Sequence, residues 1–276
     1  MDTPLNQVVI PSSFPELFTA WNRFPEALIF AGGTNLIGKS KNNILNLPPV
    51  FLCLDKITEL SHVTRTEHYL EIGAMTRLNK LINLGKKVPE VLRTCLENIE
   101  GVQFRNIATI GGNICCKRLF DLPPLFTALD AQYELRNAQS ARWVSAARFH
   151  SPADQPALEK QELLTRIRLP LHQWDYAIYQ KFFGEDYLNS ESLIFLAKTK
   201  KSILSEIRIV YKTGIILRNK NAEDILNGKY LPFSKKTADE FLENWKEFII
   251  QKKDVSDLSK NILLNSIKSN IYNLTE

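Results

Sequence analysis

The sequence is poor in residues that could hold a metal. Its four cysteines, at positions 53, 95, 115 and 116, form no C-x-x-C pair, and its four histidines show no metal-ligand spacing. Zinc ribbons and iron–sulfur clusters held by this chain are therefore not indicated, and we expect no metal site. We expect reduced thiols, with the adjacent Cys115 and Cys116 buried as small apolar residues rather than acting as a redox pair.

The sequence also lacks the usual catalytic and nucleotide-binding signatures. No nucleophile elbow occurs, and neither a G-x-G-x-x-G nor a Walker A sequence is present. A nicotinamide-binding Rossmann domain and a P-loop are therefore poorly supported. We predict no catalytic side chain.

Long apolar stretches are absent as well. The chain begins Met1-Asp2-Thr3-Pro4-Leu5-Asn6, without the basic and apolar regions of a secretory signal, and no apolar run is long enough to span a bilayer. We therefore expect a cytoplasmic protein that binds no membrane. The net charge is +5, but acidic residues are interspersed through most of the chain, which argues against nucleic acid as a partner. The segment from Lys198 to Lys220 is the basic exception, and it is either a solvated face or a docking surface for an acidic partner subunit.

The length and composition predict a folded chain of two domains. It has 276 residues, of which 44% are hydrophobic and 24% charged, and we place the domain boundary near residue 172. Ser13 and Glu16 form a capping box before one predicted helix, and Thr76 is expected to cap another. Strands are predicted at 27–31, 50–54, 69–73 and 131–136, and a β-rich stretch at 203–217 precedes two amphipathic helices, the second carrying Leu258, Ile262, Ile267 and Ile271.

Two glycine pairs are the most informative pattern in the chain. The segments Ala31-Gly32-Gly33-Thr34-Asn35 and Ala108-Thr109-Ile110-Gly111-Gly112-Asn113-Ile114 each combine apolar residues, paired glycines and a small polar residue. Paired glycines allow a positive φ and a close approach of the main chain, so successive N–H groups can converge on an anion such as a pyrophosphate. The segments therefore predict two loops that grip one ligand.

Further short motifs occur in a fixed order around these glycine pairs. They are Leu54-Asp55 with Glu59-Leu60, Ile72-Gly73-Ala74, Phe104-Arg105-Asn106-Ile107, Ala128-Leu129-Asp130-Ala131 and Glu162-Leu163-Leu164-Thr165-Arg166-Ile167. Together with the glycine segments they resemble the FAD-binding medium subunit of the molybdenum hydroxylases, the family of xanthine dehydrogenase and carbon monoxide dehydrogenase. The resemblance is close through about residue 185 and continues to Glu223-Asp224-Ile225-Leu226-Asn227-Gly228, which is similar to a late family element.

The resemblance implies an α+β fold. It implies a two-subdomain FAD-binding domain of the PCMH type at 1–172, with subdomains at about 1–55 and 56–172, and FAD between them. A small C-terminal α+β domain at 173–276 would combine a short antiparallel sheet with helices. The pyrophosphate of FAD would be wrapped by Leu28, Ile29, Phe30, Ala31, Gly32, Gly33, Thr34 and Asn35, with N–H groups of Gly32, Gly33 and Thr34 as donors, and gripped a second time by Ala108, Thr109, Ile110, Gly111 and Gly112.

Three further residues match family positions near the flavin. The resemblance implies that Asp121 contacts the sugar-like chain of FAD, that Leu164 packs beside the flavin ring, and that Lys181 places a cation near it. Asp121 also precedes Leu122-Pro123-Pro124, so it could cap a helix, and both roles can coexist. The segment from Cys115 to Phe120 departs from the family pattern.

The implied function is electron transfer. The chain would pass electrons from a [2Fe–2S] partner subunit, fed by a molybdopterin-binding large subunit, through FAD to NAD+ or another acceptor. It would be an oxidoreductase subunit that is inactive toward the organic substrate without its partners. Two alternatives stay open: a redox-inactive structural or assembly subunit of such a complex, and a free-standing flavin oxidoreductase.

Overall fold

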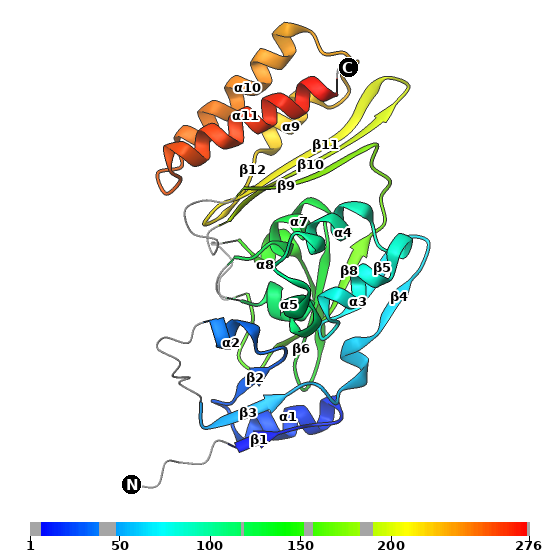
Figure 1. Ribbon diagram of the computed structural model, residues 1–276, viewed down its shortest axis with the longest axis vertical. Helices are drawn as coiled ribbons and strands as arrows, with labels where there is room; N and C mark the ends of the chain where they lie inside the picture. The colour runs from blue at the N-terminus through cyan, green and yellow to red at the C-terminus, as the bar shows by residue number, and fades with distance from the viewer. Residues whose placement is uncertain (1–6, 39–47, 117–118, 152–156, 183–189, 275–276) are drawn as a thin grey trace. The chain divides into compact units, whose positions relative to one another are not determined.

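The computed structural model of the chain describes residues 7–38, 48–116, 119–151, 157–182 and 190–274. The chain divides into two compact units, residues 1–171 and residues 172–276, each with its own core. Figure 1 shows the elements of both. None of the described helices is both long and apolar enough to cross a membrane. The four cysteines are free thiols.

The first unit begins with a small parallel sheet. Strands β1 (Gln7–Val9), β3 (Val50–Cys53) and β2 (Leu28–Phe30) lie in that order, and helix α1 (Phe14–Arg23) packs on them. The predicted cap is confirmed, because the Ser13 hydroxyl accepts the N–H of Glu16. Leu17 and Trp21 are buried on the inner side of α1, so the apolar spacing of this helix fixes which face meets the sheet. The short helix α2 (Thr34–Gly38) follows β2.

A five-stranded antiparallel sheet forms the rest of this unit. Its order is β4 (Val63–Arg65), β5 (Tyr69–Gly73), β8 (Leu163–Pro170), β6 (Gln132–Arg136) and β7 (Ala141–Ser145). The helices and 3-10 turns of this part are η1 (Thr58–Ser61), α3 (Leu78–Asn83), η2 (Gly85–Lys87), α4 (Glu90–Glu97), α5 (Val102–Ile107), α6 (Ile110–Ile114), α7 (Leu122–Ala128) and α8 (Ala146–Phe149).

The two faces of this sheet differ in polarity. Ile72, Ile167 and Tyr133 face one another in register and are fully buried. The alternate residues form ion pairs, with Glu71 Oε1 accepting from Arg168 Nε at 2.7 Å, and Arg168 stacks on the Trp143 ring at 4.2 Å. This alternation is what a strand with one buried face requires.

The structure corrects one predicted cap in this unit. Helix α3 begins after Arg77, and that residue makes no side-chain cap hydrogen bond. Thr76, the predicted cap, instead has its hydroxyl buried without a hydrogen-bond partner in the described part of the chain. Its main-chain oxygen accepts the N–H of Ile110, so the backbone of Thr76 is drawn into a long-range pairing rather than into a helix cap.

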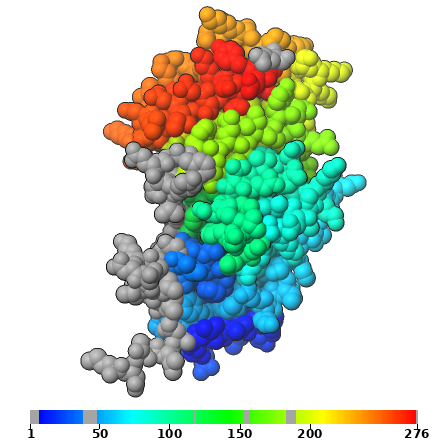
Figure 2. Space-filling model, in the orientation of Figure 1, coloured from blue at the N-terminus to red at the C-terminus, as the bar shows by residue number. Residues whose placement is uncertain are grey.

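The second unit is a four-stranded antiparallel sheet with helices packed on one face. The strand order is β12 (Ile216–Arg218), β11 (Ile203–Lys212), β10 (Glu191–Lys200) and β9 (Tyr176–Phe182), and the helices are α9 (Lys220–Leu226), α10 (Lys235–Ile250) and α11 (Asp257–Asn273). Phe195 and Tyr211 from the sheet share a core with Phe241 and Trp245 of α10 and with Ile267 of α11. Figure 2 shows α10 and α11, in orange and red, at the surface of this unit.

One residue that was predicted on the buried face of the second amphipathic helix is exposed. Leu258 was predicted on the buried face, but it is 69% exposed. Leu263, Ile267 and Ile271 are the buried residues of α11. Ser256 caps this helix by accepting the N–H of Ser259, so Leu258 sits in the first turn beyond the edge of the core.

The motif at residues 223–228, whose sequence resembles a late element of the family, has a structural role in this unit. Glu223 is 3% exposed and accepts from the main-chain N–H of Ile209 at 2.8 Å and from Arg218 Nη2 at 2.9 Å. Burial raises the pKa of Glu223, and the Arg218 pairing opposes this shift. Leu226 is fully buried in the core, and Gly228 has φ of +78°, a conformation that favours glycine. The motif therefore fastens α9 to the edge of β11.

Replacing Glu223 tests whether this residue holds α9 against β11. We expect Glu223→Ala to lower the free energy of unfolding by about 3 kcal/mol, because it leaves Arg218 and the Ile209 N–H without their buried partner. Urea unfolding followed by circular dichroism measures this, with Glu240→Ala, an exposed carboxylate on α10, as the matched control. Equal unfolding midpoints for the two variants would contradict this stabilising role of Glu223.

Candidate functional site

The first unit contains a cavity of about 680 Å³. This volume lies within the range of small-molecule and cofactor sites. Its walls come from the end of β2 and the start of α2, from the turn into α6, and from the segment that leads into β8. The residues that line it include Leu28, Ile29, Phe30, Ala31, Gly32, Gly33, Thr34, Asn35, Leu54, Ile99, Phe104, Ala108, Thr109, Gly111, Gly112, Cys115, Cys116, Phe120, Asp121, Glu159, Gln161, Glu162 and Leu164.

The two glycine segments meet backbone to backbone at this cavity. A Cβ atom at Gly32 would lie 2.3 Å from the carbonyl oxygen of Ile107 and 3.2 Å from the Cα of Ala108. No side chain fits in that space, so glycine is required for the approach. Gly33 has φ of +70°, and a Cβ there would also meet the Phe30 ring at 2.7 Å. The structure therefore brings together two segments that the sequence keeps about 75 residues apart.

The first glycine segment presents unused main-chain donors. Within the described part of the chain, the N–H groups of Gly32, Gly33, Thr34 and Asn35 have no hydrogen-bond acceptor. The reason is local: the strand ends at Phe30, and the first N–H groups of α2 precede any intrahelical acceptor. All four residues line the cavity, so this turn offers consecutive donors to an anion.

The second glycine segment is built differently from the prediction. It was expected to be a loop, but Ile110–Ile114 is helix α6, with Thr109 as its cap. The N–H groups of Ile110, Gly111 and Gly112 are already used, donating to Thr76 O at 3.0 Å, Ala74 O at 2.8 Å and Thr109 Oγ1 at 3.1 Å.

The glycine at 111 serves packing in this segment. A Cβ at Gly111 would lie 2.8 Å from the Ala74 oxygen. Ile110 is fully buried and is not among the residues that line the cavity. Of the predicted second set, the N–H of Thr109 is the one without an acceptor among the described residues. This segment therefore supports the cavity wall more than it supplies donors.

Asp121 lines the cavity and is 5% exposed. Asp121 occupies the predicted cap position before α7, but its side chain makes no cap hydrogen bond, because the second and third residues of the helix, Pro123 and Pro124, have no N–H to donate. The N–H of Leu122, the first in the helix, donates to Asn113 Oδ1 at 3.3 Å. The carboxylate of Asp121 thus has a place in the wall of the cavity that the capping of α7 does not explain.

Leu164 lies at the start of β8, 2% exposed, and also lines the cavity.

Lys181 belongs to the second unit, where it lies on β9 opposite Ser192 of β10. The cavity described here is formed by the first unit alone, so the role of Lys181 stays a prediction. Lys117 and Arg118, within the segment that departs from the family pattern, lie outside the described residues.

Cys115 does not behave as a buried apolar residue. Cys115 is exposed and Cys116 is half-buried, and both line the cavity. Desolvation raises the pKa of the Cys115 thiol to about 12, and the neighbouring Cys116 adds to the shift. Cys115 is therefore a neutral thiol at physiological pH, not a thiolate nucleophile.

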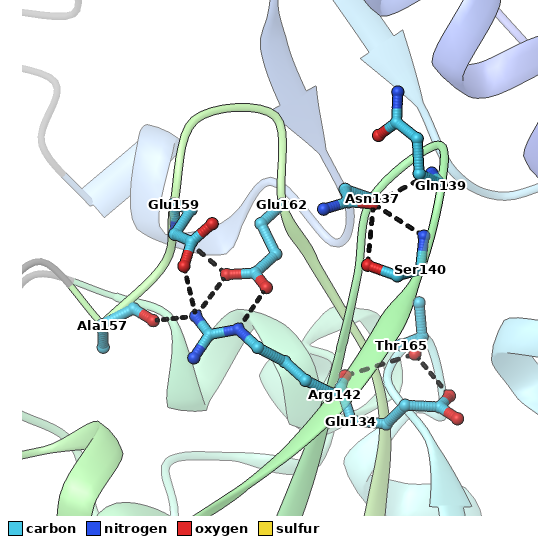
Figure 3. Close-up of polar contacts among 9 residues, drawn as sticks. All are labelled: Glu134, Asn137, Gln139, Ser140, Arg142, Ala157, Glu159, Glu162 and Thr165. Carbon is cyan, nitrogen blue, oxygen red and sulfur yellow. Dashed lines mark hydrogen bonds and ion pairs between the residues drawn. The ribbon is translucent and has the colours of Figure 1, made fainter.

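The sequence did not reveal Arg142, whose side chain binds the segment that precedes β8 (Figure 3). Arg142 reaches from β7 to Glu162, with Nε to Oε1 and Nη2 to Oε2 both at 2.7 Å, and its Nη2 also contacts Ala157 O at 3.3 Å. The same Glu162 carboxylate accepts the N–H of Glu159 at 2.9 Å. Glu162 was visible as a motif residue, but its partner 20 residues earlier carried no sequence signal.

The charge of the cavity is unusual for an anion site. Its described lining includes the acidic residues Glu100, Asp121, Glu159 and Glu162 but no lysine, arginine or histidine. Among the described residues, no group of three or more His, Cys, Asp or Glu side chains could hold a metal ion. The only positive features that the described lining offers are therefore main-chain dipoles.

Comparison with protein families gives one match that covers most of the first unit. Residues 4–172 match the family described as FAD binding domain in molybdopterin dehydrogenase. The chain is 30% identical over 187 residues to the glyceraldehyde dehydrogenase medium chain of Sulfolobus acidocaldarius, covering 66% of each chain. It is 29% identical over 214 residues to the carbon monoxide dehydrogenase medium chain of Afipia carboxidovorans, covering 75% of this chain and 74% of that one.

The chain covers only part of its larger relatives. Its match to xanthine dehydrogenase 2 of Arabidopsis thaliana, 27% identical over 244 residues, covers 79% of this chain but 18% of that protein. Among solved structures, carbon monoxide dehydrogenase from Hydrogenophaga pseudoflava has a similar fold, with a TM-score of 0.80 at 24% identity, covering 100% of this chain and 98% of that one. Quinoline 2-oxidoreductase from Pseudomonas putida 86 matches with a TM-score of 0.77 at 21% identity, covering 100% and 97%.

These matches agree with the architecture and with the resemblance carried by the ordered motifs. The fold class predicted from that resemblance, a PCMH-type FAD-binding domain followed by a small α+β domain, is confirmed. FAD is the cofactor that this family binds. The chain therefore belongs to the molybdenum hydroxylase family of oxidoreductases, as one of its FAD-binding flavoproteins.

Proposed function

We propose that this chain is the electron-transfer subunit of a molybdopterin-dependent dehydrogenase and holds FAD in the cavity of its first unit. The observation that carries the proposal is the row of four main-chain N–H groups at Gly32–Asn35, which lack acceptors in the described structure and line the cavity. Two phosphate charges need several fixed donors, and main-chain N–H groups supply them without rearrangement on binding.

The rest of the described cavity suits the other parts of FAD. Apolar side chains such as Phe30, Leu54, Phe104 and Leu164 can cover the faces of planar rings. The Asp121 carboxylate is an acceptor for hydroxyl groups such as those of the sugar-like chain. The residues present therefore fit the cofactor, with Gly32–Asn35 binding the pyrophosphate and Thr109 adding one further donor.

The chemistry belongs to the cofactor, since FAD when bound can accept electrons from one partner and pass them to another. The residues of this chain bind it, orient it and exclude water from it. We propose that electrons arrive from a [2Fe–2S] subunit fed by a molybdopterin-binding large subunit and leave to NAD+ or another acceptor. The description of two relatives as medium chains supports partner subunits.

The altered segment that begins at Cys115 supports a second candidate. Two thiols line the cavity there, and the Cys115 thiol is neutral because its pKa is raised. A subunit in which this wall prevents flavin reduction would bind FAD but serve as a structural or assembly component.

One prediction concerns the turn proposed to bind the pyrophosphate. We expect Gly32→Ala to weaken FAD binding by about tenfold or more, because the new Cβ would overlap the Ile107 oxygen and force the two glycine segments apart. Fluorescence titration of the apoprotein with FAD measures this. Gly214→Ala is the matched control, since a Cβ there meets nothing within 4 Å. Equal FAD affinity in both variants would refute the placement of the pyrophosphate.

Another prediction concerns electron flow. The purified chain should show the absorption spectrum of bound FAD, and organic substrate should reduce that FAD only when the iron–sulfur and molybdopterin subunits are added. Stopped-flow absorbance follows the reduction. Reduction by substrate without partners would indicate a free-standing oxidoreductase, and FAD that stays oxidised in the assembled complex would indicate the redox-inactive subunit.

A further inference from the structure

Arg77 lies between the two glycine segments and contacts residues on both sides. One guanidinium nitrogen, Nη2, donates to Asp55 Oδ1 at 2.8 Å, and the other, Nη1, donates to the carbonyl oxygen of Ile107. The side chains of Arg77 and Asp55 are 32% and 45% exposed, so the pair is not part of the buried core.

The two acceptors of Arg77 belong to different walls of the cavity. Asp55 follows Leu54, which lines the cavity and donates its N–H to Phe30 O at 3.0 Å, so Asp55 is tied to the end of β2 and to the first glycine segment. The Ile107 oxygen is the atom against which Gly32 packs, and it directly precedes the second segment. One guanidinium thus links the first wall to the second.

The main chain of Arg77 is itself part of the second wall. Arg77 pairs with Thr109 in an isolated antiparallel bridge. Leu78 N donates to Ala108 O at 3.0 Å, and Ile110 N donates to Thr76 O at 3.0 Å. The backbone of Arg77 therefore fixes the segment that ends at Thr109, while its side chain reaches across to the segment that begins at Gly32.

We propose that Arg77 and Asp55 form a positioning pair that sets the spacing of the two glycine segments and thereby the affinity for FAD. The inference rests on the proposed placement of the pyrophosphate between Gly32–Asn35 and Thr109. Neither residue lines the cavity, so the pair acts through main-chain atoms and not by contacting the cofactor. A half-exposed ion pair adds little to the stability of a fold, so its geometric effect can be separated from a general loss of structure.

The fork of the arginine side chain is essential to this role. A guanidinium presents separate N–H groups in a fixed plane and can hold a carboxylate and a carbonyl at once. A lysine ammonium is a compact point charge on a flexible stem, so it cannot hold both acceptors in the same geometry. Arg77→Lys should therefore restore only part of the function of Arg77.

The test compares FAD binding with stability in Arg77→Met, Asp55→Ala, the double variant and Arg77→Lys. We expect each of the first two to raise the dissociation constant for FAD about tenfold, the double variant to raise it little further, and Arg77→Lys to fall between Arg77→Met and wild type. The melting temperature of the apoprotein should stay close to that of wild type. Arg93→Met is the control, since Arg93 pairs only loosely with Glu90 and Glu97, at 3.9 and 4.0 Å, on the surface of α4.

Two competing ligands show which part of FAD the pair serves. At saturating FAD, the concentration of ADP that displaces half of the FAD should be the same in Arg77→Met and wild type, because ADP carries a pyrophosphate and loses affinity by the same factor as FAD. The concentration of riboflavin, which has no phosphate, should fall by about that factor, because its own affinity is unchanged while FAD binds more weakly. An equal loss of intrinsic affinity for riboflavin and ADP would overturn the proposal, as would strictly additive effects of the two single variants.

The failure of this proposal is distinguishable from failure of the cavity assignment. If Gly32→Ala weakens FAD binding and Arg77→Met does not, the cradle stands and the positioning pair is refuted. If neither variant changes the affinity for FAD, the pyrophosphate lies elsewhere and both proposals fall.

Discussion

The close approach of Gly32 to the main chain at Ile107 and Ala108 is the constraint on which the first unit depends. A Cβ at Gly32 would lie 2.3 Å from the Ile107 oxygen, so any other residue would hold the two segments apart. The turn after β2 and the end of helix α5 supply the two sides of this contact, and residues of both segments line the cavity. The shape of the site is therefore set by a backbone contact between distant parts of the chain.

The two glycine segments that meet at this contact differ in how they use their main-chain N–H groups. The segment after β2 keeps its N–H groups unused, because a strand ends and a short helix begins there. The segment at α6 uses its N–H groups internally, on Ala74, Thr76 and the Thr109 hydroxyl. This arrangement supports the proposed anion site, because donors that are already in place need little rearrangement and preorganisation lowers the entropy lost on binding. Similar sequence patterns thus produced two different physical roles.

Local signals explain which parts of the fold the sequence could predict. The Ser13 cap, the apolar face of α1 and the strand β6 depend on neighbours within a few residues, and the structure confirms them, although Glu134 of β6 is buried together with Tyr133 and Leu135. The errors arise where distant contacts decide. The pairing of Thr76 with Ile110 overrode the predicted cap, the N–H of Leu122 is bound by Asn113 from nine positions away, and the Gly-Gly pair at 111–112 entered a helix. Arg77 and Arg142 act on residues 20 or more positions away, so no spacing rule could find them.

A cradle built from main-chain dipoles has a consequence for the chemistry of the cofactor. A lysine or arginine beside the pyrophosphate would add a formal positive charge whose field favours the more negative, reduced form of a flavin. The described lining of this cavity holds no such cation and several carboxylates, and fixed N–H dipoles bind an anion with a field that falls off faster with distance than that of a charge. If FAD occupies the cavity as proposed, the turn at Gly32–Asn35 binds it through main-chain dipoles that add no formal positive charge, so a cation that stabilises the reduced flavin has to come from outside the described lining.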